Sequence, residues 1–234
     1  TQNYIDDTGV QVADVVVGFQ ELEAMSFDDI RQLAEEPRFD HYCWDLYARV
    51  TEWYEANASR LELRARALQD LEHGQNKRAK VARFVADRIV RLHLATMSRL
   101  NIEYDLLSWE GDILQLDFWN IAFDILKSAG AVSFQTTGKQ AGCWVMPIND
   151  ESAGETTVSD GLTETSEEDN SRNKVIVRSD GTVTYIGKDL AYQFWKFGLL
   201  DKDFYFRWFG KQKSGRLLWT TTTEATKPLE GFPP

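Results

Sequence analysis

The sequence contains few of the residues that cross-link small secreted folds or hold metal ions. Its two cysteines, Cys43 and Cys143, are far apart, and its three histidines have no zinc-ligand spacing. A disulfide framework and an ordinary zinc site are therefore excluded as interpretations, and we predict no bound metal. Sparse cysteine use of this kind favours a reducing compartment, so we expect a cytoplasmic protein.

Long apolar runs and familiar catalytic motifs are also missing. No window approaches the roughly 18 apolar residues that a membrane-spanning helix needs, and we find no basic, apolar leader. There is no phosphate-binding P-loop, no Gly-x-Gly-x-x-Gly turn and no serine nucleophile elbow. The sequence therefore predicts neither a membrane partner nor a tightly bound cofactor, and no motif names a catalytic residue.

What is present is the composition of a packed globular protein with an uneven charge. Of the 234 residues, 43% are hydrophobic and 12% aromatic, and the formal net charge is −11. Most of this charge lies in 149–172, a stretch rich in Ser, Thr, Glu and Asp that we expect to be an acidic, flexible loop. The rest is nearly balanced, so the acidic total does not exclude nucleic acid as a partner.

The order of the expected elements indicates an α/β fold, because a strand and an acidic turn precede the first helix. In that turn we expect Asp7 or Thr8 to cap the helix. The predicted elements are, in chain order, a strand at 2–5, a helix at 10–23, a loop with a short helix at 26–40, a mainly helical segment at 42–99, a strand at 104–107, a buried helix at 112–129, a hairpin at 131–146, a strand at 174–178, a helix at 185–197, strands at 204–208 and 216–220, and an irregular tail at 228–234.

Acidic residues follow several of these strands. Asp6 and Asp7 follow the first strand, Glu110 the second, and Asp189 lies in the helix after the strand at 174–178. Ligands of open α/β sheets bind at the carboxyl ends of the strands, so we expect these carboxylates to converge on an ammonium or guanidinium group. The alternative for Asp7 and Glu110 is that each only caps a helix.

One pair of residues favours a guanidinium ligand in particular. Tyr185 and Asp189 are four residues apart in a predicted helix, and residues at this spacing share a face. A carboxylate on that face can pair with a planar guanidinium through two parallel hydrogen bonds. Asp189 lies within the helix, where a capping role is less natural, so we predict a site for an arginine-like ligand.

A second candidate surface is basic. The helix that we predict at 76–99 carries Lys77, Lys80, Arg88, Arg91 and Arg99 within about 100° of arc. Such a stripe can contact a phosphate backbone. The competing interpretation, which is the commoner one, is a solvated helix face opposite an apolar one.

Taken in order, four segments resemble arginyl-tRNA synthetase, a class I aminoacyl-tRNA synthetase. The resemblance covers nearly the whole chain, and where family members usually carry Thr-Arg, this chain has Gly187-Lys188. The four segments are 3–11, similar to the strand and Asp-x-Gly-x-Gln turn after the first ATP signature; 104–110, similar to the segment that supplies a glutamate to the arginine pocket; 138–146, similar to a hairpin of the family; and 178–189, similar to the arginine-recognition motif.

The resemblance implies a partial Rossmann-like catalytic domain with a largely helical insertion and a β-hairpin. It divides the chain into a strand–turn–helix unit at 1–25, the helical insertion at 26–100, a strand, buried helix and hairpin at 101–148, the acidic loop at 149–172, and a second Rossmann-like portion with the arginine-recognition motif at 173–234. No His-Ile-Gly-His type or Lys-Met-Ser-Lys-Ser type signature is present in the sequence. We therefore expect a part of the catalytic domain that lacks both ATP signatures and the anticodon-binding domain.

The function that the resemblance implies is ligation of arginine to tRNA-Arg at the expense of ATP. L-arginine would then bind Glu110, Tyr185 and Asp189; ATP, with its Mg²⁺, would lie near Gly9 and Gln11; and tRNA-Arg would contact Lys77, Lys80, Arg88 and Arg91. We expect the isolated chain to have little or no ligase activity. The alternatives are a non-catalytic remnant that binds arginine, tRNA or a partner protein, and a structural domain whose acids are caps. The sequence predicts no oligomeric state.

Overall fold

The computed structural model describes residues 1–147 and 173–225. The predicted acidic loop at 149–172 and the predicted tail at 228–234 therefore lie outside the described residues. The described elements, in chain order, are β1 (Gln2–Ile5), α1 (Val10–Val17), a π-helical turn η1 (Gly18–Leu22), α2 (Phe27–Leu33), α3 (Phe39–Glu55), a 3-10 turn η2 (Ala58–Arg60), α4 (Leu61–His73), α5 (Lys77–Arg99), β2 (Leu106–Trp109), α6 (Glu110–Gln115), α7 (Phe118–Ser128), β3 (Ser133–Phe134), β4 (Trp144–Pro147), β5 (Asn173–Val177), α8 (Tyr185–Lys196), β6 (Tyr205–Lys211) and β7 (Leu217–Thr222).

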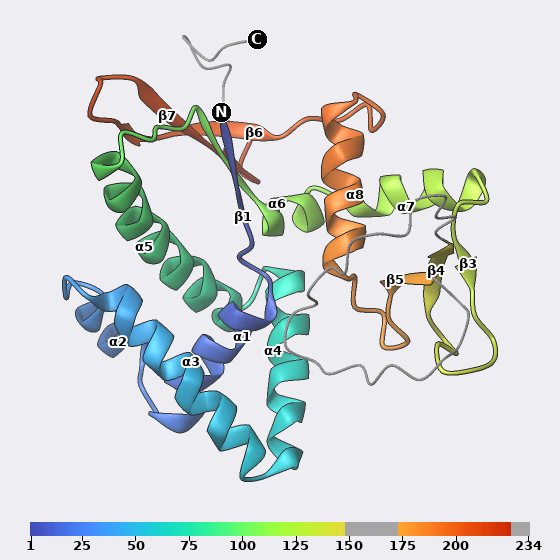
Figure 1. Ribbon diagram of the computed structural model, residues 1–234, viewed down its shortest axis with the longest axis horizontal. Coiled ribbons are helices and arrows are strands. Elements are labelled where there is room, and N and C mark those ends of the chain that lie inside the picture. The colour runs from blue at the N-terminus through green and yellow to red at the C-terminus, as the bar shows by residue number, and fades with distance from the viewer. Residues whose placement is uncertain (148–172, 226–234) are drawn as a thin grey trace.

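A four-stranded sheet in the order β1-β2-β7-β6 positions the site (Figure 1). β1, β2 and β7 are parallel, whereas β6 pairs antiparallel with β7. The register puts Ile5 beside Trp109, the last residue of each strand. Because neighbouring parallel strands end at one edge of the sheet, the turns after β1 and β2 lie next to each other. The predicted α/β class and the strand at 2–5 are confirmed.

Helices α1 to α5 form the helical part of the molecule, at the lower left of Figure 1. Their apolar faces enclose a core that includes Phe19, Phe39 and Leu46. The local sequence fixes the helix boundaries. Asn76 Oδ1 accepts the backbone N–H of Ala79 at the start of α5, and Gly74 ends α4 in the left-handed region with φ 73°. The predicted helical segment is confirmed.

A second core lies between α6, α7, α8 and a separate antiparallel sheet in the order β3-β4-β5, which contains the predicted hairpin. The strand before α8, β5, belongs to this sheet and not to the parallel one. Our expectation that Asp189 follows a strand of the parallel sheet is therefore wrong. Instead, α8 packs against α7, and the Tyr192 hydroxyl is hydrogen-bonded to Ser108 Oγ of β2 at 2.9 Å.

Two local expectations also need correction. The buried helix predicted at 112–129 is two helices, because Asp117 lies between α6 and α7 with φ 67°, a left-handed conformation that interrupts an α-helix. The N-cap of α1 is Gly9 and not Asp7 or Thr8, and no side chain caps that helix. Both predicted caps are buried and have partners elsewhere in the site.

Within residues 1–147 and 173–225, none of the helices combines the length and the apolar character that crossing a membrane requires.

Candidate functional site

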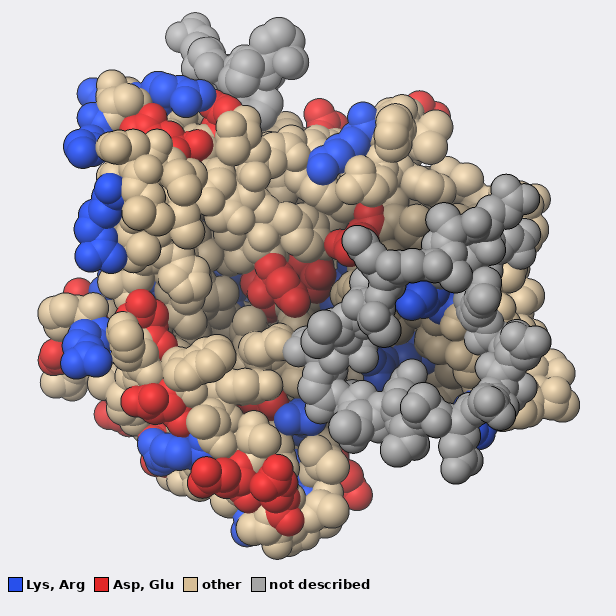
Figure 2. Space-filling view, viewed as in Figure 1, with Lys and Arg blue, Asp and Glu red and all other residues tan. Residues whose placement is uncertain are grey.

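Carboxylates from four separate elements meet near the ends of β1 and β2. We call Asp6, Glu72, Glu110 and Asp189 the acidic cluster; they come from the turn after β1, from α4, from the start of α6 and from α8. Acidic side chains gather near the middle of the face drawn in Figure 2, where β1 ends in Figure 1. The cluster therefore joins the parallel sheet, the helical part and α8.

Glu110 lies at the centre of the cluster and is only 2% exposed. Its Oε2 atom accepts a hydrogen bond from the Tyr4 hydroxyl at 3.1 Å. Its Oε1 atom accepts from the Thr8 hydroxyl and, at 2.9 Å, from the Lys188 ammonium. Both carboxylate oxygens are thus engaged by groups of the protein itself, as a buried charge requires.

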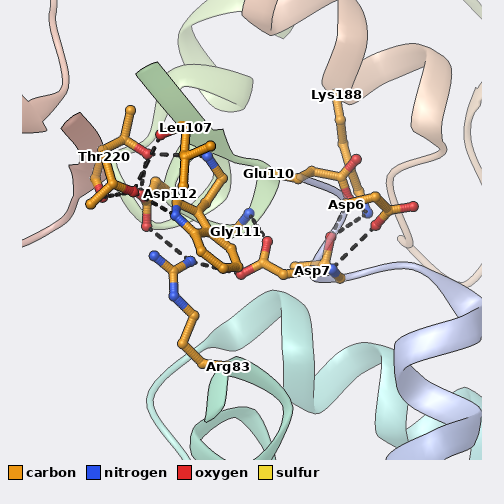
Figure 3. A network of polar contacts seen from close by, with 12 residues as sticks. Asp6, Asp7, Arg83, Leu107, Glu110, Gly111, Asp112, Lys188 and Thr220 are labelled. Atoms are coloured by element: carbon orange, nitrogen blue, oxygen red, sulfur yellow. Dashed lines mark hydrogen bonds and ion pairs between the residues drawn. The ribbon is translucent and has the colours of Figure 1, made fainter. Parts of the chain in front are cut away.

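Lys188 is the cation of the cluster and is 5% exposed (Figure 3). Besides its bond to Glu110, its Nζ atom donates to Thr8 Oγ1 at 2.9 Å and lies 3.7 Å from Glu72 Oε1. Burial acts to lower the pKa of Lys188, but the charges of Glu110, Glu72 and Asp6 outweigh it, so the pKa is raised. The ammonium group is therefore charged at neutral pH.

Asp6 and Asp189 are the members of the cluster whose side chains are exposed. The surrounding protein still desolvates Asp6, and together with the nearby charge of Glu110 this raises the pKa of Asp6 to about 6. The pKa of Asp189 is raised as well, first by burial and then by Glu110. Burial also raises the pKa of Glu72. The carboxylates thus repel one another, and a further cation would relieve that repulsion.

A second polar network supports the same two turns from α5 (Figure 3). Arg83 Nη1 donates to Asp7 Oδ2 at 2.7 Å and lies 3.6 Å from Asp112 Oδ1, with its guanidinium 3.8 Å from the centre of the Trp109 ring. Asp7 Oδ1 accepts the backbone N–H of Gly111 at 2.8 Å. Arg83 therefore links the helical part to the ends of β1 and β2.

The predicted arginine-binding residues have very different surroundings. Tyr185, the first residue of α8, is 62% exposed, Asp189 is exposed one turn later, and Glu110 is buried. Glu110 and Asp189 are close enough for their charges to interact, because the charge of Glu110 contributes to the raised pKa of Asp189. The structure thus brings these two carboxylates into one site, and the arginine-binding roles stay predictions.

The residues predicted to bind ATP lie near the acidic cluster, and the residues predicted to bind tRNA lie on α5. Gly9 has the Asp6 carboxylate folded over it: a Cβ atom there would be 2.4 Å from Asp6 Oδ2. Gln11 is exposed at the start of α1. On α5, Lys77 and Lys80 are exposed, whereas Arg88 donates to the Ala34 carbonyl and Arg91 pairs with Asp87. These binding roles also remain predictions.

Lys188 and Glu72 were missed by the sequence reasoning. The sequence analysis noted Lys188 only as part of the Gly187-Lys188 difference from the family, although it is three residues after Tyr185 and so shares its helix face. That spacing was a usable signal. Nothing in the sequence pointed to Glu72, because it comes from α4, far from the other members along the chain. Among the described residues, no group of three or more His, Cys, Asp or Glu could hold a metal ion.

The amino-acid sequence is similar to those of arginine–tRNA ligases. No family model matches the chain. The chain is 33% identical to the arginine–tRNA ligase of Thermococcus kodakarensis over 229 residues, which are 95% of this chain and 33% of that protein. It is 31% identical to the arginine–tRNA ligase of Deinococcus radiodurans over 223 residues, with 95% and 32% of the two chains covered.

A solved structure shows the same relationship. The structure of Thermus thermophilus arginyl-tRNA synthetase matches with a TM-score of 0.64 and 30% identity, over 95% of this chain and 33% of that chain. The fold is therefore of the α/β class found in an aminoacyl-tRNA synthetase. Within that class, the chain is similar to arginyl-tRNA synthetases, and it spans about a third of the length of the proteins it matches.

Proposed function

We propose that this chain supplies the arginine-binding part of an arginine–tRNA ligase. The observation that carries the proposal is the acidic cluster: four carboxylates surround the ammonium of Lys188, which leaves an excess of negative charge. A guanidinium group beside Asp189 would offset that excess through paired, charge-assisted hydrogen bonds. The similarity to enzymes named as arginine–tRNA ligases supports arginine as the ligand.

The reaction of such a ligase has two steps. The arginine carboxylate attacks the α-phosphorus of ATP, which gives arginyl-adenylate and pyrophosphate. A hydroxyl of the terminal ribose of tRNA-Arg then attacks the carbonyl carbon of the adenylate, which gives arginyl-tRNA and releases AMP. Catalysis of this kind depends mainly on positioning and charge stabilisation. In this proposal Asp189 and Tyr185 hold the side chain of arginine, and Glu110 contributes to the negative field of the site.

The other ligands follow from the same proposal. ATP, with Mg²⁺, would lie by the turn of Gly9 and Gln11, and tRNA-Arg would contact the exposed basic face of α5, which includes Lys77 and Lys80. An enzyme with these substrates would act in protein synthesis in the cytoplasm. The exposure of the two lysines supports the tRNA contact, because basic side chains that are open to solvent can pair with phosphates.

Calorimetric titration of the 234-residue chain tests the arginine site. We expect L-arginine to bind, and we expect citrulline, which has a neutral urea group in place of the guanidinium, to bind at least about tenfold more weakly. Lysine is the second control, because its ammonium is a point charge that cannot pair in a planar fork. Equal affinity for arginine and lysine, or no binding of arginine, would contradict the proposal.

A further inference from the structure

We propose that a groove beside the end of α5 binds a short acidic segment of a partner protein that carries large apolar side chains. The groove has a volume of about 320 Å³ and lies between the last turns of α5, the segment after that helix and the turn that joins β6 to β7. It shares no residue with the acidic cluster, so the inference goes beyond the proposed function. We call it the basic groove and define it by Arg91, Leu94, Ile102, Phe209, Lys211 and Lys213.

The inner surface of the basic groove is apolar. Leu94 on α5 and Phe209 on β6 are partly buried and pack against the core that contains Leu218. Ile102, which follows α5, is a large apolar residue that is 42% exposed. An apolar side chain of another molecule would remove this surface from water, and burial of apolar surface favours binding.

Basic side chains surround this apolar surface. Lys211, the last residue of β6, and Lys213, in the turn after it, are both exposed. Within residues 1–147 and 173–225, no hydrogen bond or ion pair engages either lysine side chain. Basic side chains gather at the upper left of Figure 2, where Figure 1 shows the turn between β6 and β7 and the end of α5. On a chain with a net charge of −11, this local positive charge favours an acidic partner.

Hydrogen bonds within the protein hold the basic groove in shape. The side-chain amide of Gln212 donates to the Tyr104 carbonyl at 2.7 Å and accepts the Tyr104 N–H at 2.9 Å. Glu103 also lines the groove, and its carboxylate accepts the backbone N–H of Ser214 at 2.9 Å. The hydrogen bonds from Ser214 lower the pKa of Glu103, which keeps that carboxylate against the turn. A preformed groove loses little conformational entropy when a peptide binds.

The chemistry of the basic groove suits a peptide better than RNA. Proteins bind the bases of single-stranded RNA mainly by stacking them on open aromatic rings. The Phe209 ring is already covered by Arg91, whose guanidinium lies 4.3 Å from the ring centre and pairs with Asp87 at 2.6 Å. Leu94 and Ile102 are aliphatic and offer no stacking surface. The occupant is therefore a segment in which acidic residues flank apolar ones, as in Asp-Glu-Phe-Leu-Asp-Glu.

An NMR titration of the isotopically labelled 234-residue chain with the peptide Asp-Glu-Phe-Leu-Asp-Glu tests the proposal. We expect the amide signals of Ile102, Phe209 and Lys211 to shift and to saturate, with a dissociation constant on the order of 100 µM for so small an interface. Two control peptides should bind at least about tenfold more weakly: Asp-Glu-Ser-Ser-Asp-Glu, which lacks the apolar side chains, and Lys-Arg-Phe-Leu-Lys-Arg, which reverses the charge. No saturable shift with the first peptide, or equal binding of either control, overturns the proposal.

Surface variants connect peptide binding to the basic groove. Lys211→Glu should weaken binding of the acidic peptide about tenfold and strengthen binding of the basic peptide by a similar factor, and Ile102→Ser should weaken the acidic peptide severalfold. Lys202→Glu and Leu199→Ser change exposed residues outside the groove and should bind as the wild type does. Equal losses in the groove variants and these controls would overturn the proposal. If circular dichroism shows Lys211→Glu to be unfolded, Lys213→Glu takes its place.

Two other occupants would give different results. If an oligouridylate competes with the acidic peptide and binds more tightly, the basic groove is an RNA site. If sedimentation shows the wild-type chain to be a dimer and Ile102→Ser to be a monomer, a second copy of the chain fills the groove. Either result overturns the proposal. Arginine titration tests the proposed function separately, because Glu110, Tyr185 and Asp189 do not line the groove.

Discussion

At the scale of single residues, the site depends on the contrast between buried and exposed carboxylates. Glu110 is buried and fully paired, whereas Asp6 and Asp189 reach solvent beside it. The pKa values of Asp6 and Asp189 are raised, because partial burial and the charge of Glu110 both favour the protonated forms. The ionisation of these exposed carboxylates should therefore control both ligand binding and stability.

Arginine affinity and folding stability should depend on pH in opposite directions. Asp6 has a pKa of about 6, so arginine affinity should fall severalfold as the pH falls from 7 to 5 and the carboxylate protonates. The raised folded-state pKa means that the folded chain binds the proton more tightly than the unfolded chain, so the contribution of Asp6 to stability increases from about pH 6 down to about pH 4. Calorimetry and urea denaturation over this range measure the two trends. If affinity instead rises on acidification, ionised Asp6 does not hold the ligand.

Gly9 offers a test of the position of Asp6. In Gly9→Ala the new methyl group would overlap the Asp6 carboxylate, which must move, while φ of −78° at this position suits alanine. We expect arginine affinity to fall severalfold and the free energy of unfolding to change by less than about 1 kcal/mol. Gly210→Ala is the matched control, since a Cβ atom there meets nothing within 4 Å. An Asp6-independent ligand site would leave both variants at wild-type affinity.

At the scale of elements, the sequence was most informative where the signals are local. Hydrophobic periodicity predicted the helical part well, and the hairpin at 131–146 was confirmed. The broken helix at Asp117 was missed, because apolar residues surround it and a single left-handed aspartate leaves no periodic signal. The pairing of β5 with β4 in a separate sheet also could not be predicted, because pairing between strands that are distant along the chain depends on tertiary packing.

We predict that the contact of Arg83 on α5 with the turns after β1 and β2 stabilises the fold. Arg83→Met leaves Asp7 and Asp112 buried beside each other without their guanidinium, so we expect a loss of about 3 kcal/mol in the free energy of unfolding. Urea denaturation measures it. Arg99→Met, on the same helix, is the control, because that guanidinium contacts Thr96 at the surface. Equal stability of the two variants would show that Arg83 is dispensable to the site.

At the scale of the whole molecule, the candidate site lies where three parts of the fold meet. The segments that follow β1 and β2 supply Asp6 and Glu110, the helical part supplies Glu72 through α4, and α8 supplies Lys188 and Asp189. The sequence reasoning found the residues that follow strands or share a helix face, because those relationships are local. It missed Glu72, whose role depends on packing between elements that are distant along the chain, and it did not use the helix face that Lys188 shares with Tyr185.

The extent of the chain gives a functional prediction. It spans about a third of the length of the ligases it matches, and its sequence contains neither ATP signature. Arginine-dependent exchange of pyrophosphate into ATP by the isolated chain should therefore be at the background rate, even where arginine binds. Exchange at a rate comparable with that of a complete arginine–tRNA ligase would contradict this prediction, because the 234-residue chain would then suffice for adenylate formation.

The most direct test of the central claim is arginine binding by Asp189→Asn. The substitution keeps the shape of the side chain and removes the charge that faces solvent beside Glu110. Calorimetry should show at least a tenfold loss of affinity, the size expected for one charge-assisted hydrogen bond. Asp124→Asn, which removes an exposed carboxylate on α7 paired with Lys127, should bind as the wild type does. Wild-type affinity in Asp189→Asn would contradict the claim that this carboxylate grips the guanidinium.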